Sequence, residues 1–110
     1  MKMRMLACAA LLAAGLAAPP CFAECVLPRP PSRIPNGASA SQQEMLQAMQ
    51  TLKQYNADVT EYLQCLEFEQ RRGRLDVNVG VHEHNSAVDE LAKVAGQFNE
   101  QVRIFKSTHG

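Results

Sequence analysis

Two stretches of the chain carry apolar residues at alternating spacings of four and three, the repeat of helices that pack along one stripe. The first stretch begins at Ser41, and Glu44 three residues later completes a capping box. It ends at Gly73, a residue type that often terminates helices. The pattern predicts helices over about residues 42–72 and 80–107, with one seam at Met45, Met49, Leu52, Asn56, Val59, Leu63 and Leu66 and a second seam at His84, Val88, Leu91, Ala95, Phe98, Val102 and Phe105.

A short connection between the two helices predicts that they pack against each other in antiparallel orientation. When the seams are paired in opposite directions, the residue numbers of all seven layers add to 150 or 151, which places the turn near Leu75. Asn56 then faces Ala95, and a polar residue in a seam is expected to fix the register. Between residues 71 and 81 we expect irregular structure or a frayed helix start, because Gly80 favours helix poorly and the apolar residues alternate as in a strand: Leu75, Val77, Val79 and Val81.

The first 23 residues have the features of a secretory signal peptide. Lys2 and Arg4 precede an apolar run of 14 residues, and Cys21-Phe22-Ala23 places small residues where a signal peptidase reads them, so cleavage is expected after Ala23. The protein is therefore expected in the periplasm or outside the cell, as one domain of 87 residues from a chain of 110. A retained anchor is the alternative, but a membrane span needs roughly 20 apolar residues, so we expect no membrane insertion after cleavage.

Two cysteines, Cys25 and Cys65, remain after this cleavage. In an oxidising compartment two cysteines most simply form one disulfide, although two free thiols or an intermolecular bond are alternatives. Residues 24–40 hold four prolines between Pro28 and Pro35, which predicts a stiff, extended arm.

The arm has the length needed to run back along the first helix if the two cysteines are bonded. It would span roughly 34 Å in the polyproline II conformation, and the helix up to Cys65 spans roughly 36 Å. Tyr55 and Tyr62 flank the first seam on the side of Cys65, so the arm is expected to lie against them. We therefore predict an all-α fold, a coiled-coil-like antiparallel two-helix hairpin over residues 41–110 with a Pro-rich arm stapled to the first helix.

Short motifs along the chain carry a resemblance to known proteins. They are C-x-x-P-x-P-P in the arm, NGASAS followed by EM at the start of the first helix, EYLQC ending in Cys65, and HN-x-x-VDELxxVA with FNEQVR in the second helix. In combination they resemble a family of small exported helical-hairpin proteins of Gram-negative bacteria that have no assigned function. The resemblance covers Cys25 to Lys106 and implies export and a helical hairpin, without implying any catalytic residue.

The best chemical candidates in the sequence are the histidines of His82-Glu83-His84. Two positions apart on a helix, their side chains point about 200° away from each other. The segment is not the H-E-x-x-H of zinc peptidases, since residue 86 is serine. A metal-binding protein that uses His82 and His84 is therefore a secondary alternative. The sequence contains no recognisable catalytic triad or phosphate-binding loop, and we expect no enzymatic activity, no cofactor and no bound metal.

The charge of the mature chain favours a protein partner over nucleic acid. Without Lys2 and Arg4 it has 9 Lys and Arg against 11 Asp and Glu, whereas nucleic-acid binding needs a concentrated basic surface. We expect a structural or protein-interaction protein, with a homodimer that forms a four-helix bundle as one arrangement.

The sequence offers two other candidate partner surfaces. An envelope chaperone would bind apolar segments through a patch of Phe68, Val94 and Ile104. If the arm does not dock, Tyr55, Tyr62 and Phe68 become the candidate partner surface.

Overall fold

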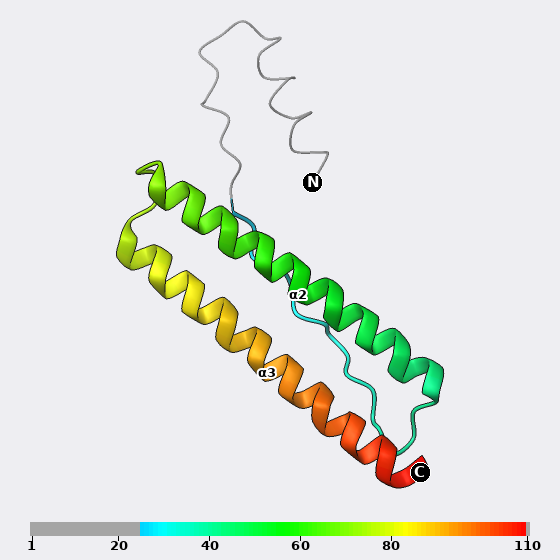
Figure 1. Ribbon diagram of the computed structural model, residues 1–110. Coiled ribbons are helices and arrows are strands. Elements are labelled where there is room, and N and C mark those ends of the chain that lie inside the picture. Colours follow the sequence, from blue (N-terminus) through cyan, green and yellow to red (C-terminus); the bar gives the residue numbers. More distant parts are fainter. Residues whose placement is uncertain (1–24, 110) are drawn as a thin grey trace, which may run out of the picture.

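The computed structural model describes residues 25–109 and confirms the predicted two-helix hairpin (Figure 1). Its helices are α2 (Gln42–Arg71, 30 residues) and α3 (Val77–His109, 33 residues), which pack against each other in antiparallel orientation. Residues 25–109 contain no β-strand, and neither helix has the apolar character that a membrane-spanning segment of its length requires. The predicted signal peptide and its cleavage site after Ala23 lie outside the described residues.

Local capping residues set both ends of α2. At its start the Ser41 hydroxyl accepts a hydrogen bond from the Glu44 N–H (3.1 Å), and the Glu44 carboxylate accepts one from the Ser41 N–H (3.2 Å), which confirms the predicted capping box. Just beyond its end Gly73 adopts a positive φ of 71°. The Arg74 N–H then donates to the Glu69 carbonyl oxygen (2.9 Å), as in the Schellman motif, which favours glycine at this position.

The turn is shorter than predicted, and the expected irregular start of the second helix is wrong. α3 begins at Val77 because the Asp76 carboxylate caps it, accepting a hydrogen bond from the Asn78 N–H (2.9 Å). Gly80 is buried against the Gln70 side chain, where a Cβ atom would collide with the amide oxygen. The Gln70 side chain is flexible and can move aside, so this contact does not by itself require glycine. The alternating valines of this segment are exposed helical residues.

The N-terminal arm forms a third layer against the hairpin (Figure 1). The predicted disulfide is confirmed, since Cys25 is bonded to Cys65 of α2. Ile34, further along the arm, packs against both hydrophobic clusters of the core. The predicted path along α2 is incomplete, because the far end of the arm lies on α3. There the Gly37 N–H donates a hydrogen bond to the Gln101 side-chain oxygen (2.8 Å).

The buried stripe of each helix is rotated from the predicted seam toward the arm. Met49 and Val88, both predicted seam positions, are 36% and 38% exposed. Asn56 and His84 are also exposed, so the prediction that Asn56 fixes the register from within the core is wrong. The arm explains the rotation, because a third layer on one side buries the adjacent positions of both helices. The core consists of Ala40, Met45, Tyr55, Val59, Tyr62, Leu66, Ala87, Val94 and Phe98.

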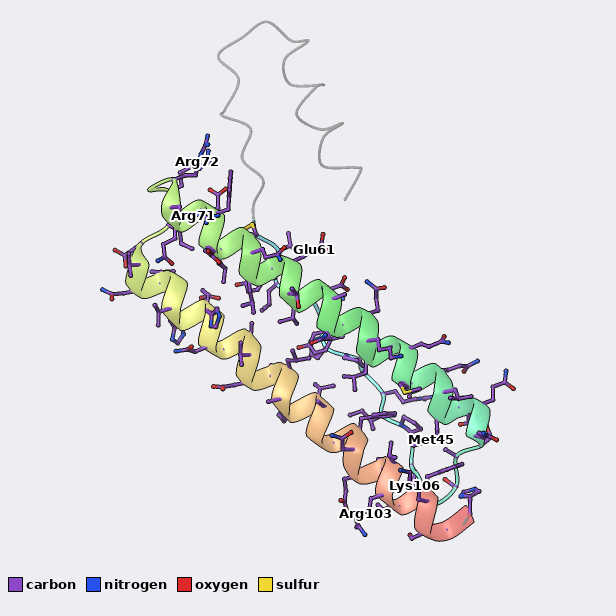
Figure 2. The ribbon with its side chains drawn as sticks, in the orientation of Figure 1. Met45, Glu61, Arg71, Arg72, Arg103 and Lys106 are labelled. Atoms are coloured by element: carbon purple, nitrogen blue, oxygen red, sulfur yellow. A yellow bond between two sulfur atoms is a disulfide. The ribbon has the colours of Figure 1, made fainter. Side chains whose placement is uncertain are left out.

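The contacts at the two ends of the hairpin agree with the predicted register. Near the turn, Gly80 lies against Gln70, and their residue numbers add to 150, as in the predicted layers. Met45 lies at the other end, away from Arg71 (Figure 2), in a cluster around which Phe105 also packs. The helices are therefore paired over their full length, and only their rotation about their own axes differs from the sequence-based expectation.

Gly37 lets the arm approach the backbone of α3 closely, and replacing it should loosen this end of the arm. A Cβ atom at residue 37 would overlap the Gln101 carbonyl oxygen and lie 2.9 Å from the Phe105 nitrogen, and helix backbone cannot move aside as a side chain can. We expect Gly37→Ala to lower the free energy of unfolding by about 1–3 kcal/mol, the usual cost of overpacking, in urea denaturation of the oxidised protein. Ser39→Ala, at an exposed position of the same turn, should change it by less than about 0.5 kcal/mol. Equal losses in the two variants would contradict the close approach.

Candidate functional site

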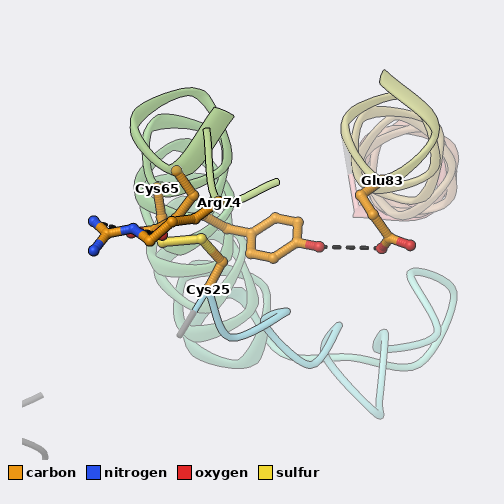
Figure 3. The surroundings of a disulfide bond; sticks show 6 residues. Cys25, Cys65, Arg74 and Glu83 are labelled. Carbon is orange, nitrogen blue, oxygen red and sulfur yellow. Dashed lines mark hydrogen bonds and ion pairs between the residues drawn. A yellow bond between two sulfur atoms is a disulfide. The ribbon is translucent and has the colours of Figure 1, made fainter. Parts of the chain in front are cut away.

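The disulfide joins the arm to the last third of α2, on the face of the hairpin that the arm covers (Figure 3). Beside it the nearly buried Glu69 carboxylate pairs with Arg74 (2.8 Å). Both sulfur atoms are bonded, and residues 25–109 contain no free thiol. This cluster therefore holds the arm and the turn in place and presents no thiolate nucleophile.

Under the arm, two tyrosines of α2 lie opposite two glutamates of α3. The Tyr62 hydroxyl donates a hydrogen bond to Glu83 (3.2 Å; Figure 3). Burial raises the pKa of Tyr62, and the hydrogen bond and negative charge of Glu83 raise it further. Burial also raises the pKa of Tyr55, with a smaller contribution from the charge of Glu90. Both phenols therefore stay protonated at neutral pH and serve packing and hydrogen bonding.

These two tyrosines do not form the partner surface that the sequence suggests for an undocked arm. Tyr55 and Tyr62 are only 5% and 6% exposed beneath the arm. The condition for that surface, an undocked arm, is not met in the folded protein, because the arm docks and covers both rings.

Because the pKa values of Tyr55 and Tyr62 are raised in the folded protein, its free energy of unfolding should fall at alkaline pH. In the folded state both exceed the ordinary value of 10.0, so the folded protein keeps phenol protons that the unfolded chain already releases. This contribution is complete below about pH 10 and is lost as the pH rises through the raised values. Tyr62→Phe should therefore show a smaller fall in the free energy of unfolding above pH 10 than the wild type, measured by urea denaturation across the pH range. An equal fall in both proteins would contradict this role of Tyr62.

His82 and His84 are both exposed in the early turns of α3. His84 is not packed in the seam as predicted, and its Nδ1 atom lies 3.4 Å from the Asn85 side-chain oxygen. Within residues 25–109, no three His, Cys, Asp or Glu side chains are grouped so that they could hold a metal ion. The two histidines therefore lack the further protein ligands from which a structural metal site is built.

The predicted chaperone-like patch is not formed. Val94 is buried between the helices, and Ile104 is half-buried beside the arm. Phe68 alone is exposed, at 45%, and the Arg72 guanidinium lies over its ring at 5.3 Å from the ring centre. The three residues therefore share no surface, because the rotated packing takes Val94 into the core.

The face of the hairpin opposite the arm carries several apolar residues. No other part of residues 25–109 covers this face, so its apolar residues are exposed or only half-buried. Successive residues of a helix are rotated by about 100° around its axis. The buried stripe marks the side of each helix that faces its neighbour, and the arm marks one flank of that stripe, so the residues on the other flank can be identified. We call this surface the arm-free face. On α2 it comprises Met49, Lys53, Asn56, Thr60, Leu63 and Glu67. On α3 it comprises Val81, His84, Val88, Leu91, Ala95 and Val102.

The arm-free face is hollowed near the turn. A groove of about 410 Å³ lies there between the helices, and its walls include Leu63, Leu66, Val81 and His84. Val81 is 51% exposed at its rim, and Val88 continues the exposed apolar stripe along α3. The sequence already contained this signal, because three of these positions belong to the predicted seams: the hairpin buries Leu63 only partly and leaves His84 and Val88 exposed.

Charge is distributed unequally between the two sides of α3. Between Val77 and Phe105, α3 carries six Asp, Glu, Lys or Arg residues, and none of them falls on the arm-free face. On the arm side a groove between the arm and α3 is lined by two charged residues of α3, Lys93 and Glu100. The uncharged side of α3 is therefore the side that the arm does not cover.

Comparison with protein-family models, curated proteins and solved structures finds no match to this chain. The class of the protein is therefore defined by its fold, an antiparallel two-helix hairpin with an extended arm clamped by a disulfide. Its candidate functional site is the arm-free face, the uncovered side of that hairpin.

Proposed function

We propose that this protein is exported and acts by binding a protein partner through its arm-free face. The observation that carries the proposal is the difference between the two faces of the hairpin. The arm and its disulfide close one face, whereas the other leaves Val81 and Val88 exposed beside half-buried Leu63 and Leu91. Protein interfaces are depleted of charge at their centres and apolar there, which is the character of this side of α3.

The proposed export rests on the N-terminal sequence and on the disulfide. Residues 1–23 have the basic start, apolar run and small-residue cleavage site of a signal peptide. Disulfides such as Cys25–Cys65 persist mainly in oxidising compartments. Together they support a location in the periplasm or outside the cell.

A photo-crosslinking amino acid placed in the full-length protein tests this function in a Gram-negative host. Position 88 lies on the arm-free face, and position 26, where Val26 is 53% exposed at the start of the arm, serves as the matched control. We expect the exported protein to begin at Glu24 by intact mass, and we expect irradiation to give a discrete adduct from position 88 but not from position 26. Adducts from neither position, or equally from both, would contradict the proposed surface, and cytoplasmic protein with reduced cysteines would contradict export.

A further inference from the structure

We infer that the arm-free face binds a second copy of this chain, so that two hairpins form an antiparallel four-helix bundle with a two-fold axis near Thr60. The inference rests on the proposed function and specifies its partner. In this arrangement α2 packs against α2 of the second copy, and α3 packs against its counterpart. The axis lies close to the middle of α2, so the two hairpins overlap over almost their whole length.

The arm-free face has the size that a stable dimer needs. α2 has 30 residues and is therefore about 45 Å long. Two helices side by side present a face roughly 20 Å wide. The product is about 900 Å², and stable protein–protein interfaces bury about 800 Å² on each partner. A single additional helix would cover only about half of this face, whereas a second hairpin covers all of it.

The polar residues of α2 on and beside this face are arranged symmetrically about Thr60. Lys53 and Glu67 lie seven residues to either side of it, and Asn56 and Gln64 lie four residues to either side. A two-fold axis pairs residue i with residue j and residue j with residue i. In the antiparallel dimer each Lys53 therefore meets Glu67 of the second copy, and each Asn56 meets the Gln64 amide of the second copy.

The ion pair between the copies is compatible with the contacts inside one hairpin. Glu67 pairs with Arg71 through one carboxylate oxygen at 3.3 Å, and both side chains are about two-thirds exposed. The second oxygen of the carboxylate is the one that would accept from Lys53. Thr60 lies on the axis, and its hydroxyl donates to the Asn56 carbonyl oxygen of its own helix (2.9 Å), so the contact with its counterpart leaves no hydroxyl donor unpaired.

The α3 side of the face supplies apolar contacts at the same level of the bundle. The register of the hairpin places Thr60 beside the region of Leu91, so the two copies of α3 also cross there. This crossing brings Val88 opposite Ala95 of the second copy, a larger residue opposite a smaller one. No charged residue of α3 between Val77 and Phe105 falls in the contact. The two helices therefore contribute differently, with pairing specificity from α2 and apolar burial from α3.

The oligomeric state of the oxidised protein, produced from the full-length gene, is the first test. We expect sedimentation equilibrium to show twice the mass of the mature chain. Val88→Lys should weaken the dimer by roughly a hundredfold or more, because it buries an unpaired charge. Val26→Lys, the same change on the arm, should leave the dimer intact, and circular dichroism should show unchanged helix content in both variants. A wild-type protein that is monomeric at all concentrations, or a dimer that Val88→Lys leaves unaffected, would overturn the inference.

A charge-reversal series tests the two-fold arrangement itself. Lys53→Glu places two glutamates together in each of the two symmetric pairs, and Glu67→Lys places two lysines together, so each variant should weaken the dimer by roughly tenfold. The double variant restores both pairs and should return the dissociation constant to near that of the wild type. Single variants without effect, or a double variant no better than the single ones, would rule out this alignment of α2.

The crosslinking experiment separates failure of this inference from failure of the proposed function. An adduct from position 88 with twice the mass of the mature chain supports the second copy. An adduct with another mass, together with a monomeric purified protein, would overturn the inference and leave the arm-free face as the binding surface of a different protein. Absence of any adduct from position 88 would contradict both.

Discussion

Replacing Phe98 with alanine should lower the free energy of unfolding by about 3–5 kcal/mol, the cost of deleting a buried aromatic side chain. Phe98 is 7% exposed and shares a buried cluster with Ala40 and Met45. Ile34 of the arm also packs against this cluster, so the ring lies where the two helices and the arm meet. The loss is measurable as a reduced midpoint in urea denaturation of the oxidised protein. For a domain of this size it would remove a large part of the total stability, since single domains have only about 5–15 kcal/mol.

Phe68→Ala is the matched control for this prediction. Phe68 also lies in a long helix, but it is 45% exposed and contacts Arg72 at the surface. We expect its removal to cost less than about 1 kcal/mol. Comparable losses from the two substitutions would show that burial at Phe98 does not determine the stability.

The features that could be predicted from the sequence are those determined by local chemistry. The capping box requires only two residues at the right spacing, Ser41 and Glu44. The end of α2 requires only a residue that adopts a positive φ readily, which is Gly73. The pairing of Cys25 with Cys65 follows from the cysteine content and from the matching lengths of arm and helix. The antiparallel register could also be predicted, because it depends on the spacing between layers rather than on which side of each helix is buried.

The rotation of the helices could not be predicted, because α2 contains two heptad patterns that share several positions. One passes through Met49 and Asn56, and the other passes through Tyr55 and Tyr62. Spacing alone cannot choose between them. The arm determines which pattern is buried, because it adds a third layer on the tyrosine side and covers both rings.

The start of α3 is a different kind of error. The alternating valines suggested a strand, whereas a single capping carboxylate at Asp76 outweighs that pattern by accepting hydrogen bonds from the first turn. The signal was present in the sequence as an aspartate directly before the helix. The sequence-based prediction gave more weight to Gly80, which is poorly suited to helix but lies buried within α3.

The rotation also connects the arm with the proposed binding surface. A bare hairpin would bury the predicted seam, with Met49 and Val88 between the helices. Because the arm draws the tyrosine side into the core instead, those residues become partly exposed on the opposite face. The seam residues are therefore shared between the intramolecular core and the arm-free face: Leu63 and Leu91 pack against the core, whereas Met49 and Val88 leave part of their apolar surface in solvent.

Removal of the disulfide should have the second large effect. The bond joins residues 40 positions apart, and in the chain-entropy model a loop of this length stabilises the folded state by about 4 kcal/mol. We expect the double variant Cys25→Ala and Cys65→Ala, or reduction of the wild type, to lower the free energy of unfolding by about that amount. The arm should detach more readily than the helices, because it has no hydrogen-bonded ladder of its own.

Limited trypsin digestion distinguishes a released arm from a globally weakened fold. The bond after Arg33 precedes Ile34, which is packed against the core while the arm is docked, so it should be cut much faster in the double variant than in the oxidised wild type. The bond after Arg72 lies in the exposed turn in both proteins and provides an internal control whose cleavage rate should stay nearly constant. Faster cleavage at both bonds with loss of helical circular dichroism would mean that the hairpin does not stay folded without its docked arm. Unchanged protection after Arg33 would mean instead that packing of Ile34 and the Gly37 contact hold the arm, and that the disulfide contributes only by limiting the unfolded chain.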